Sequence, residues 1–521
     1  MMNDDPQYSI KGAGSLYVFL VVVYRLYLSP LARFPGPRLA AATGLYETYF
    51  QIIKGGVYTW EIDRLHEEYG PIIRVKPNEL HIKDPDYYNT VYAGPGKHRN
   101  KDLAFSNITF PQSLFSTAEH AIHSKRRGVL GQFFKKNAIA TFEPVIQANT
   151  NALCRHFTNG AQTSLPLELH TAFECFSSDT ISQYAFGHQD GFHYLDEPAL
   201  PSTWKNRITS MFELCRVARH FPMLGPLGRI FPAISMRVCP KYKHVYEFEK
   251  DVRARVRNAI AQHAGCSTTN VFPHLASEKG TSPECLTPIY RSILADPTVR
   301  LSEKESCRLE EDALFLMMAG TDAPSQALAI TMFHILNNPE VYHKLKAELV
   351  AGIVDVTVVP TLGDMEQLPY LTATIREGLR LSSIVTSRLP RSAPDEDLWY
   401  QEWRIPAGTL VSMSTYFILR DSNIFPEPTR FIPERWLVGP EDLQRLQRYL
   451  VPASKGSLGC LGQNMNWSFM HIVIGTILRR FDLALYDTTE KNVEMTRDNF
   501  IGQTDPGMNV VQVRVLEQYL Q

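Results

Sequence analysis

The chain has 521 residues, of which 44% are hydrophobic and 21% are charged, and its formal net charge is −1 at pH 7. These values place it among ordinary globular proteins with a large core. They give no basic field of the kind that attracts nucleic acid, so nucleic acid is excluded as an expected partner.

The N-terminal segment contains a short apolar run. Between Gly12 and Leu28 the only charged residue is Arg25, which is close enough to one end to snorkel. A bilayer span needs ~20 apolar residues, so residues 12–28 lie near the lower limit. A cleaved signal peptide is the alternative, but no small-residue cleavage site follows. We therefore expect residues 1–29 to be an uncleaved, single-pass membrane anchor in contact with lipid.

A proline-rich hinge follows over residues 30–40, where three prolines fix φ and block helix continuation. Arginines follow the apolar run, and Asp4 and Asp5 precede it. This asymmetry predicts that the main body, residues 41–521, lies in the cytosol.

The eight cysteines include no CxxC pair and no Cys/His cluster with zinc spacing. In a chain of this length we expect reduced, mostly buried thiols rather than a disulfide framework. The glycosylation sequons at Asn107 and Asn466 are therefore expected to be unused.

The first half of the chain alternates between helical and strand patterns. Residues 57–70 form an amphipathic pattern that predicts a helix, and the alternation over 72–82 predicts a strand pair. Residues 118–260 are mostly helical in pattern, with proline and glycine breaks around 222–240.

The second half predicts one long helix over 302–337, roughly 50 Å in length, that starts at a capping box formed by Ser302 and Glu305. A further helix is predicted over 367–382, and a strand–turn–strand unit over 403–414. The expected fold class is mainly α with small β-sheets (α+β), arranged as one large domain.

The segment 455–465, KGSLGCLGQNM, surrounds a single thiol with glycines, and a helical pattern follows it. A thiolate is a metal ligand, and glycine N–H groups together with a helix N-terminus stabilise its charge. The alternative is a buried structural cysteine in a turn.

This loop resembles the haem loop of the cytochrome P450 family, which has the form F-x-x-G-x-R-x-C-x-G. Gly456, Cys460 and Gly462 match it, whereas Ala453 replaces the aromatic residue and Leu458 replaces the arginine. The resemblance, which covers about residues 30–515, implies the P450 fold and haem b as the cofactor. It also implies that the thiolate of Cys460 is the axial iron ligand.

Two further segments carry the resemblance. Glu377 and Arg380 match the family's E-x-x-R motif, and Arg435 in FIPERW resembles the third member of that network. E-x-x-R alone is weak, because the chain contains six copies. The order and spacing of the three pieces make the match specific. A solvated ion pair is the alternative for each piece by itself.

The resemblance places the helix 302–337 across the distal face of the haem. The family pattern there is [AG]-G-x-[DE]-T, in which the alcohol helps to deliver protons for oxygen activation. This chain keeps the acid but lacks the alcohol, because the five positions read Ala319, Gly320, Thr321, Asp322 and Ala323.

The geometry of a helix leaves few substitutes for the missing alcohol. Thr321 and Ser325 lie about 200° away from position 323, whereas Gln326 lies about 60° away. Pro324 has no N–H and should free the carbonyl of Gly320. Asp322, Gly320 and Gln326 are therefore the candidate catalytic groups; the alternative for Pro324 is a kink without a role.

The haem propionates need cations. By resemblance, His123 and Arg127 on one helix face and Arg391 supply them, and Leu458 removes a further one. Basic residues over 125–136 suggest a docking patch for an acidic reductase, although a solvated surface explains them equally well.

The expected function is that of a fungal, endoplasmic reticulum haem-thiolate monooxygenase. It would use O2 and electrons from NADPH through a separate reductase, since no nucleotide-binding glycine loop is present. The expected substrate is a small apolar secondary metabolite such as a terpenoid or polyketide. Two alternatives stay open: an isomerase, dehydratase or cyclase of the same fold that does not use O2, and a non-catalytic haem-binding protein.

Overall fold

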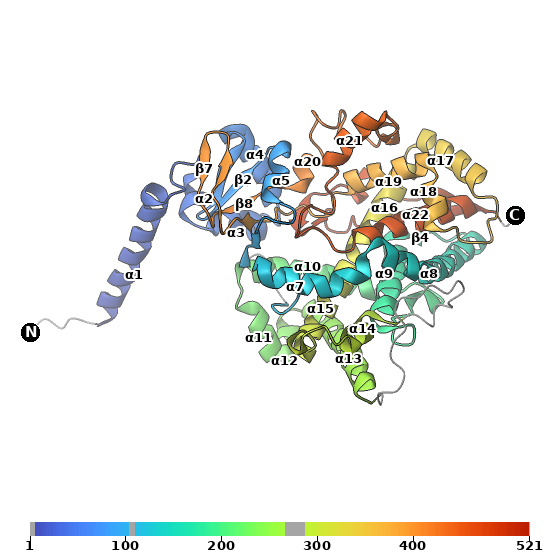
Figure 1. Cartoon of the computed structure of the whole chain (residues 1–521), viewed down its shortest axis with the longest axis horizontal. Helices are drawn as coiled ribbons and strands as arrows, with labels where there is room; N and C mark the ends of the chain where they lie inside the picture. Colours follow the sequence, from blue (N-terminus) through green and yellow to red (C-terminus); the bar gives the residue numbers. More distant parts are fainter. Residues whose placement is uncertain (1–5, 104–109, 266–286, 520–521) are drawn as a thin grey trace, which may run out of the picture.

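The computed structural model describes residues 6–103, 110–265 and 287–519. Figure 1 shows an N-terminal helix that stands apart from the body, then a part rich in strands, and then a larger helical part. The N-terminal helix α1 spans Pro6–Val23 and continues as a π-helical segment, η1, over Tyr24–Leu28. The fold is mainly helical with small sheets, as the sequence predicts.

The first half of the body consists mostly of helices. The predicted helix over 57–70 is present, and the predicted helical region 118–260 breaks into shorter helices where prolines and glycines concentrate. In chain order these helices are α2 (Arg38–Ala42), α3 (Leu45–Thr48), η2 (Tyr49–Ile53), α4 (Tyr58–Tyr69), η3 (Pro85–Tyr87), α5 (Tyr88–Val91), α7 (His120–Gly131), η4 (Gln132–Phe134), α8 (Lys136–Thr163), α9 (Leu169–Phe186), η5 (Tyr194–Asp196), α10 (Thr203–His220), α11 (Leu224–Ile230), α12 (Pro232–Val238) and α13 (Tyr242–Gly265).

The second half contains the most deeply buried helices. α16 packs against α9, α19 and α22, and these four elements form the centre of the main core. The helices are α14 (Ile289–Ala295), η7 (Leu301–Glu303), α15 (Ser306–Ala319), α16 (Asp322–Leu336), α17 (Pro339–Gly352), α18 (Leu362–Glu366), α19 (Pro369–Ser382), α20 (Thr415–Ile418), η8 (Pro433–Trp436), α21 (Pro440–Tyr449), α22 (Gln463–Arg480) and η9 (Glu490–Asn492).

The predicted single helix over 302–337 is wrong in two respects. It is divided into α15 and α16 at Gly320 and Thr321, and Ser302 lies in the short 3₁₀ turn η7 instead of capping α15. The break is physically reasonable because Pro324, in the first turn of α16, has no N–H to donate to the Gly320 carbonyl.

A five-stranded sheet has the order β1-β2-β8-β5-β3. β2 and β8 pair in parallel, and the other neighbours pair antiparallel. The expected strand pair over 72–82 is the β1–β2 hairpin. The strands are β1 (Ile72–Lys76), β2 (Glu79–Ile82), β3 (Asn100–Lys101), β5 (Arg391–Ser392) and β8 (Leu410–Ser412).

The predicted unit over 403–414 does contain two strands, but they belong to different sheets. β7 pairs with β6, whereas β8 pairs with β2 and β5. Two other small sheets have the orders β4-β12-β9 and β10-β11. The remaining strands are β4 (Leu167–Glu168), β6 (Leu398–Tyr400), β7 (Trp403–Ile405), β9 (Phe481–Leu485), β10 (Arg497–Asn499), β11 (Ile501–Gln503) and β12 (Gln512–Gln518).

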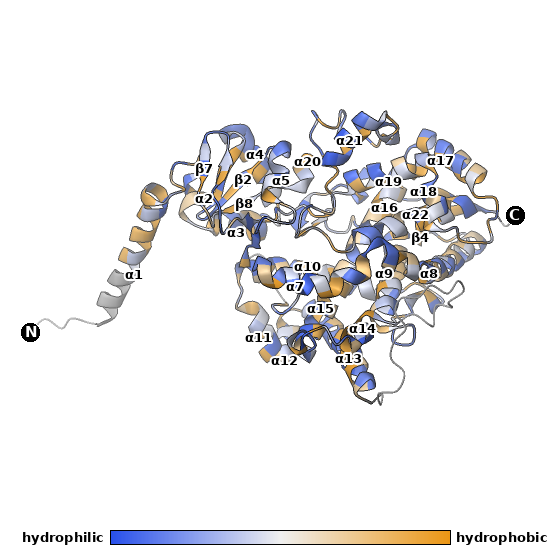
Figure 2. Ribbon diagram, in the orientation of Figure 1, coloured by the Kyte–Doolittle hydropathy of each residue, from blue (hydrophilic) through white to orange (hydrophobic). Residues whose placement is uncertain are grey.

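In the N-terminal region, none of the helices that the structure describes is both long and apolar enough to cross a bilayer. Figure 2 nevertheless shows mostly apolar residues along the described part of α1, which stands away from the body. Arg25 contacts the body, because its Nη1 donates a hydrogen bond of 2.9 Å to the Ala42 carbonyl oxygen. The proline-rich segment 30–40 lies against β1, where the Arg74 N–H donates to the Pro35 carbonyl oxygen at 2.7 Å.

None of the cysteines within the described residues, at positions 154, 175, 215, 239, 307 and 460, forms a disulfide. The sequon at Asn107 lies outside the described residues. Asn466 lies within α22, and its side-chain Oδ1 is buried, which is a poor position for a glycan.

Candidate active site

The loop that carries Cys460 is held against the segment before β3 by close backbone contacts. Gly456 has φ +74°, and a Cβ there would lie 2.2 Å from the Ala93 carbonyl oxygen, so only glycine fits without displacement. The Ser457 N–H donates to the same oxygen at 3.1 Å, and the Cys460 N–H donates to the Ala453 carbonyl oxygen at 2.8 Å.

The Cys460 thiol lies just before α22, with Gly462 as the N-terminal residue flanking that helix. Burial by surrounding atoms raises the pKa of the thiol, while the Gly462 N–H and the charge of Arg127 lower it. The residue as a whole is still exposed, which suits a cysteine that must reach a ligand. A bound cation at the sulfur would favour the thiolate further.

Four basic residues gather beside this loop from three elements. His123 and Arg127 lie on α7, and the Nη1 of Arg127 donates to the Gly459 carbonyl oxygen at 2.7 Å. Lys101 on β3 and Arg391 on β5 are direct cross-strand partners. Lys101 was not predicted from the sequence.

Three of these four basic side chains lack a carboxylate partner in the part of the chain that the structure describes. Within the described residues, no carboxylate forms an ion pair with Lys101, Arg127 or Arg391, and the buried Nε of Arg391 has no hydrogen-bond partner. Burial, followed by Arg391 and Arg127, lowers the pKa of Lys101 well below its usual value. Burial, followed by Lys101 and Arg127, lowers the pKa of His123 to about 2.

Like charges placed opposite each other across two strands destabilise a sheet unless an anion lies between them. An orphaned guanidinium nitrogen and the surrounding cations therefore suit a ligand that brings its own carboxylates. The two propionates of haem b fit this requirement, and Cys460 would offer its iron a sulfur ligand. Lys455, which lies in the Cys460 loop, instead donates to the Arg448 carbonyl oxygen.

The Glu377 carboxylate of α19 is the centre of a buried network. Arg380 binds it with two hydrogen bonds of 2.7 and 2.9 Å, and the Nε of Arg435 donates to it at 3.0 Å. The Trp436 Nε1 and the Ile432 N–H also donate to this carboxylate. Both Glu377 and Arg380 are fully buried. The arginines lower the pKa of Glu377 against the effect of burial, so the carboxylate is ionised.

The break between α15 and α16 has two faces. Ala319 is exposed and Gly320 and Ala323 are partly exposed, although most of the neighbouring residues are buried. Asp322 and Gln326 are buried on the other face, where the Gln326 Nε2 donates to the Asp322 Oδ2 at 3.0 Å. The predicted catalytic groups therefore lie together, but Gln326 contacts the acid rather than the open face.

The hydroxyl groups near the break are occupied by the helix itself. The Thr321 Oγ1 donates to the Met317 carbonyl oxygen at 2.7 Å, and the Ser325 Oγ donates to the Thr321 carbonyl oxygen at 2.5 Å. Neither hydroxyl takes the place of the alcohol that Ala323 lacks.

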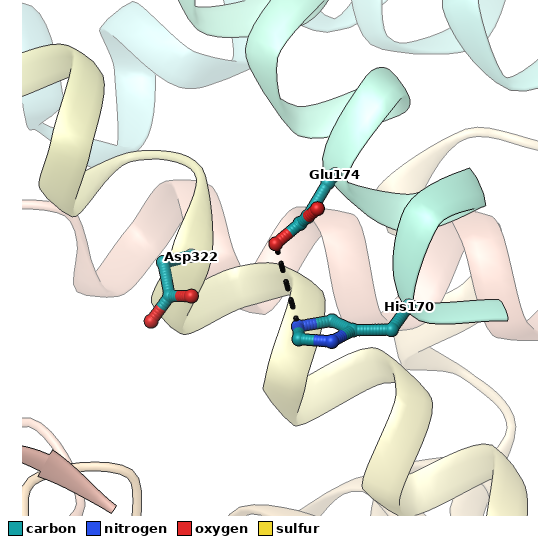
Figure 3. A group of neighbouring side chains, drawn as sticks. All are labelled: His170, Glu174 and Asp322. Carbon is teal, nitrogen blue, oxygen red and sulfur yellow. Dashed lines mark ion pairs between the residues drawn. The ribbon is translucent and has the colours of Figure 1, made fainter. Parts of the chain in front are cut away.

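Two buried residues of α9, which the sequence analysis did not single out, lie beside Asp322. Figure 3 shows His170 and Glu174 on α9 facing Asp322 at the start of α16, and the His170 Nε2 lies 3.6 Å from the Glu174 Oε1. The side-chain ligand atoms of the three residues lie within 4.8 Å of one another. The i,i+4 spacing of His170 and Glu174 is visible in the sequence, but it does not reveal which element they face.

Comparisons with known proteins identify the family of this chain. The cytochrome P450 family model matches residues 45–510. Conidiogenone synthase PchP450 of Penicillium rubens is 35% identical, covering 93% of this chain and 94% of that protein. A cytochrome P450 monooxygenase of Trichoderma arundinaceum is 34% identical, covering 94% and 91%. The monooxygenase astB of Aspergillus terreus is 33% identical, covering 98% and 97%. Together with the thiolate loop and the cation cluster, these matches show that the chain belongs to the cytochrome P450 family.

Proposed function

We propose that this cytochrome P450 monooxygenase oxidises a small, apolar secondary metabolite of the terpenoid or polyketide class. The observation that carries the substrate proposal is an aromatic wall beside the open face of the break. Phe115 stacks on Phe315 of α15 with centroids 4.2 Å apart, and Phe500 meets Phe115 edge-on at 5.6 Å. All three rings are half-buried, so they offer apolar surface to a ligand.

Different residues of the chain have different roles in binding the cofactor. Haem b with a thiolate ligand supplies O2 binding and O–O bond cleavage. Cys460 provides that ligand, and Gly456 and Gly462 allow the loop to approach it. Arg127, Arg391, His123 and Lys101 hold the propionates, and the Glu377 network fixes the segments that support the loop.

The test of this function is the dependence of product formation on O2 and NADPH. Co-expression with neighbouring pathway genes, followed by metabolite profiling, identifies the substrate. The purified enzyme with a NADPH-cytochrome reductase should then form product only when both O2 and NADPH are present. Product that forms without O2 would support the isomerase, dehydratase or cyclase alternative instead. Absence of any turnover would support a non-catalytic haem protein.

We expect Arg127→Ala to release haem. Removing one partner of a buried, hydrogen-bonded charge pair costs about 2 kcal/mol or more, which is roughly thirty-fold in affinity. Leu458→Arg should tighten haem binding, since it restores a cation. Haem transfer to apomyoglobin measures both effects.

The matched control is Lys125→Ala, because Lys125 lies on the same helix but is exposed. It should retain haem like the unaltered protein. If Leu458→Arg tightens binding while Arg127→Ala changes nothing, another group neutralises the propionates.

Proton delivery during O2 reduction is proposed to begin at Asp322, with Gln326 orienting its carboxyl and the Gly320 carbonyl able to hold a water molecule. Burial raises the pKa of Asp322 to about 7, against the hydrogen bond from Gln326. A carboxyl with this pKa both gives up and regains a proton near neutral pH.

Residues 1–29 are proposed to anchor the enzyme to the endoplasmic reticulum membrane, with the hinge over 30–40 and the catalytic domain over 41–521 in the cytosol. Support comes from five consecutive residues of α1, Leu16 to Leu20, which are each at least 55% exposed and predominantly apolar. The reductase is proposed to dock at the basic surface over residues 125–136, where Lys125 of α7 and Lys135, which directly precedes α8, are exposed.

A chain that begins at Arg33 should leave the membrane pellet, at least in part, and still bind haem. Flotation with vesicles of phosphatidylcholine and phosphatidylserine, together with the reduced CO spectrum, measures both properties. Equal flotation of the shortened and full chains would contradict the anchor.

A further inference from the structure

The cluster formed by His170, Glu174 and Asp322 is unusual because it is buried and incompletely satisfied. His170 is 2% exposed, Glu174 1% and Asp322 4%. Both ring nitrogens of His170 and the Oε2 of Glu174 lack hydrogen-bond partners among the residues that the structure describes. Two ionised carboxylates in such a place would be costly, since a buried charge needs a partner.

The neighbouring charges do not neutralise this cluster. Lys205 on α10 is the nearby cation, but its Nζ is engaged by the Glu168 Oε2 at 3.2 Å and by the Asn509 carbonyl oxygen at 2.7 Å. The Glu168 carboxylate also accepts the backbone N–H groups of His170 and Thr171 at the start of α9. The cluster therefore has to hold protons or a cation.

His170 lines a small pocket that two partly exposed asparagines also line. The pocket measures about 10 Å³, which is room for about one water molecule. His170 and Gln326 line its inner side, and Asn492 and Asn509, which are both partly exposed, line its outer side. At the opposite end of the cluster, Asp322 begins α16 at the helix break, next to the partly exposed Ala323.

We propose that His170, Glu174 and Asp322 form a proton route that leads from this pocket to the break between α15 and α16. The inference rests on the role proposed above for Asp322 and adds its source of protons. Glu174 is the intermediate carrier, and His170 is the entry group.

The protonation states agree with this route. Burial, and then Asp322, raise the pKa of Glu174 well above its usual value, which favours the protonated carboxylic acid. Burial lowers the pKa of His170 to about 3, so the imidazole is neutral and has one N–H and one acceptor nitrogen. An acid, a neutral imidazole and a carboxyl that titrates near pH 7 can exchange protons without creating a lasting buried charge.

The transfer of one proton along the route involves each of the three side chains in turn. Asp322 gives its carboxyl proton to the open face of the break, where O2 would be reduced, and takes the carboxyl proton of Glu174. Glu174 takes the Nε2 proton of His170 as the Nδ1 takes a proton from water in the pocket, and solvent re-protonates that water. His170 is left as the Nδ1–H tautomer, and tautomer exchange restores the Nε2–H before the next proton passes. The net result is the transfer of one proton from solvent, with every group returned to its original charge. The electrons come from NADPH through the reductase.

The test needs no substrate, because substrate-free turnover divides electrons between hydrogen peroxide and water. The full-chain holoenzyme is mixed with reductase, NADPH and O2 between pH 6 and 8, in H2O and in D2O. In the unaltered enzyme, the peroxide fraction should rise as the pH passes about 7, because Asp322 loses its proton there. Glu174→Gln and His170→Gln should raise the peroxide fraction several-fold and remove its pH dependence. Glu174→Asp keeps a carboxyl group, so it should restore part of the pH dependence.

The matched control is Asp179→Asn, which also changes a buried carboxyl of α9 into an amide. Asp179 accepts the N–H groups of Tyr194 and Leu195 and lies outside the cluster, so the peroxide fraction of this variant should keep the original pH profile.

Asp322→Asn separates the two proposals. If it raises peroxide while the variants at 170 and 174 do not, the route is wrong and the role of Asp322 stands; if it has no effect, both fail.

Two further measurements test the route in the unaltered holoenzyme. They remain decisive if a variant fails to bind haem. Infrared spectra at neutral pH should show the stretch of a protonated buried carboxyl, and its absence would overturn the proposal. A divalent metal retained at one equivalent, apart from the haem iron, would also overturn it, because the metal would occupy the place of the protons.

Discussion

Cys460→Ser is expected to abolish the thiolate-type spectrum of the reduced CO complex completely. A serine hydroxyl is not deprotonated near neutral pH and is a harder ligand than a thiolate, so it cannot donate the same electron density to iron. The loop itself should persist, because the Cys460 N–H and the glycine contacts that hold it are backbone interactions. Monooxygenase activity should be lost with the spectrum.

The control for this prediction is Cys307→Ser. Cys307 is also a free, exposed thiol, but it lies in the first turn of α15. Its replacement should leave the spectrum unchanged. A normal spectrum in Cys460→Ser would assign the iron ligand to another residue.

Glu377→Gln should prevent accumulation of the folded holoenzyme. The change leaves Arg380, which is 0% exposed, and the mostly buried Arg435 without their shared anion. Breaking a buried ion pair by removing one partner costs about 3–5 kcal/mol, a large share of the roughly 5–15 kcal/mol that stabilises a typical domain. The yield of haem-containing protein and the free energy of unfolding in urea measure the effect.

The same sequence motif at the surface provides the control. Glu427 and Arg430 have the same i,i+3 spacing, but their side chains are 56% and 69% exposed. Exposed pairs contribute about 0–1 kcal/mol, so Glu427→Gln should fold and bind haem normally. Similar losses in both variants would mean that burial is not what makes the Glu377 pair important.

The contrast between these two pairs shows what the sequence can and cannot reveal. Six E-x-x-R motifs occur in the chain, and spacing alone does not distinguish them. Only packing of α19 against the segment around η8 buries the Glu377 copy and adds a second arginine. The position of the motif between other family segments indicated the correct copy, but its burial is a property of the fold.

The long helix illustrates a limit of local reasoning. The sequence identified Pro324 as a residue that opens the backbone, but the apolar pattern continues on both sides, so it predicted one helix. In the structure, the chain breaks at Gly320, where a Cβ would lie 2.8 Å from the Ile181 side chain of α9. A second helix, α9, therefore approaches closely at the break. A local sequence pattern cannot predict this approach.

The sequence by itself determined the features that depend on neighbouring residues: the glycine-lined thiol loop, most of the helices, and the choice of Cys460, Glu377 and Asp322 as candidate site residues. Only the tertiary structure placed Lys101 opposite Arg391 and brought His170 and Glu174 to Asp322. Periodicity and spacing report on contacts within a few residues of the chain. The charge of a cross-strand pair and the pKa of a buried acid depend on segments that are distant in sequence, so they are decided when those segments pack.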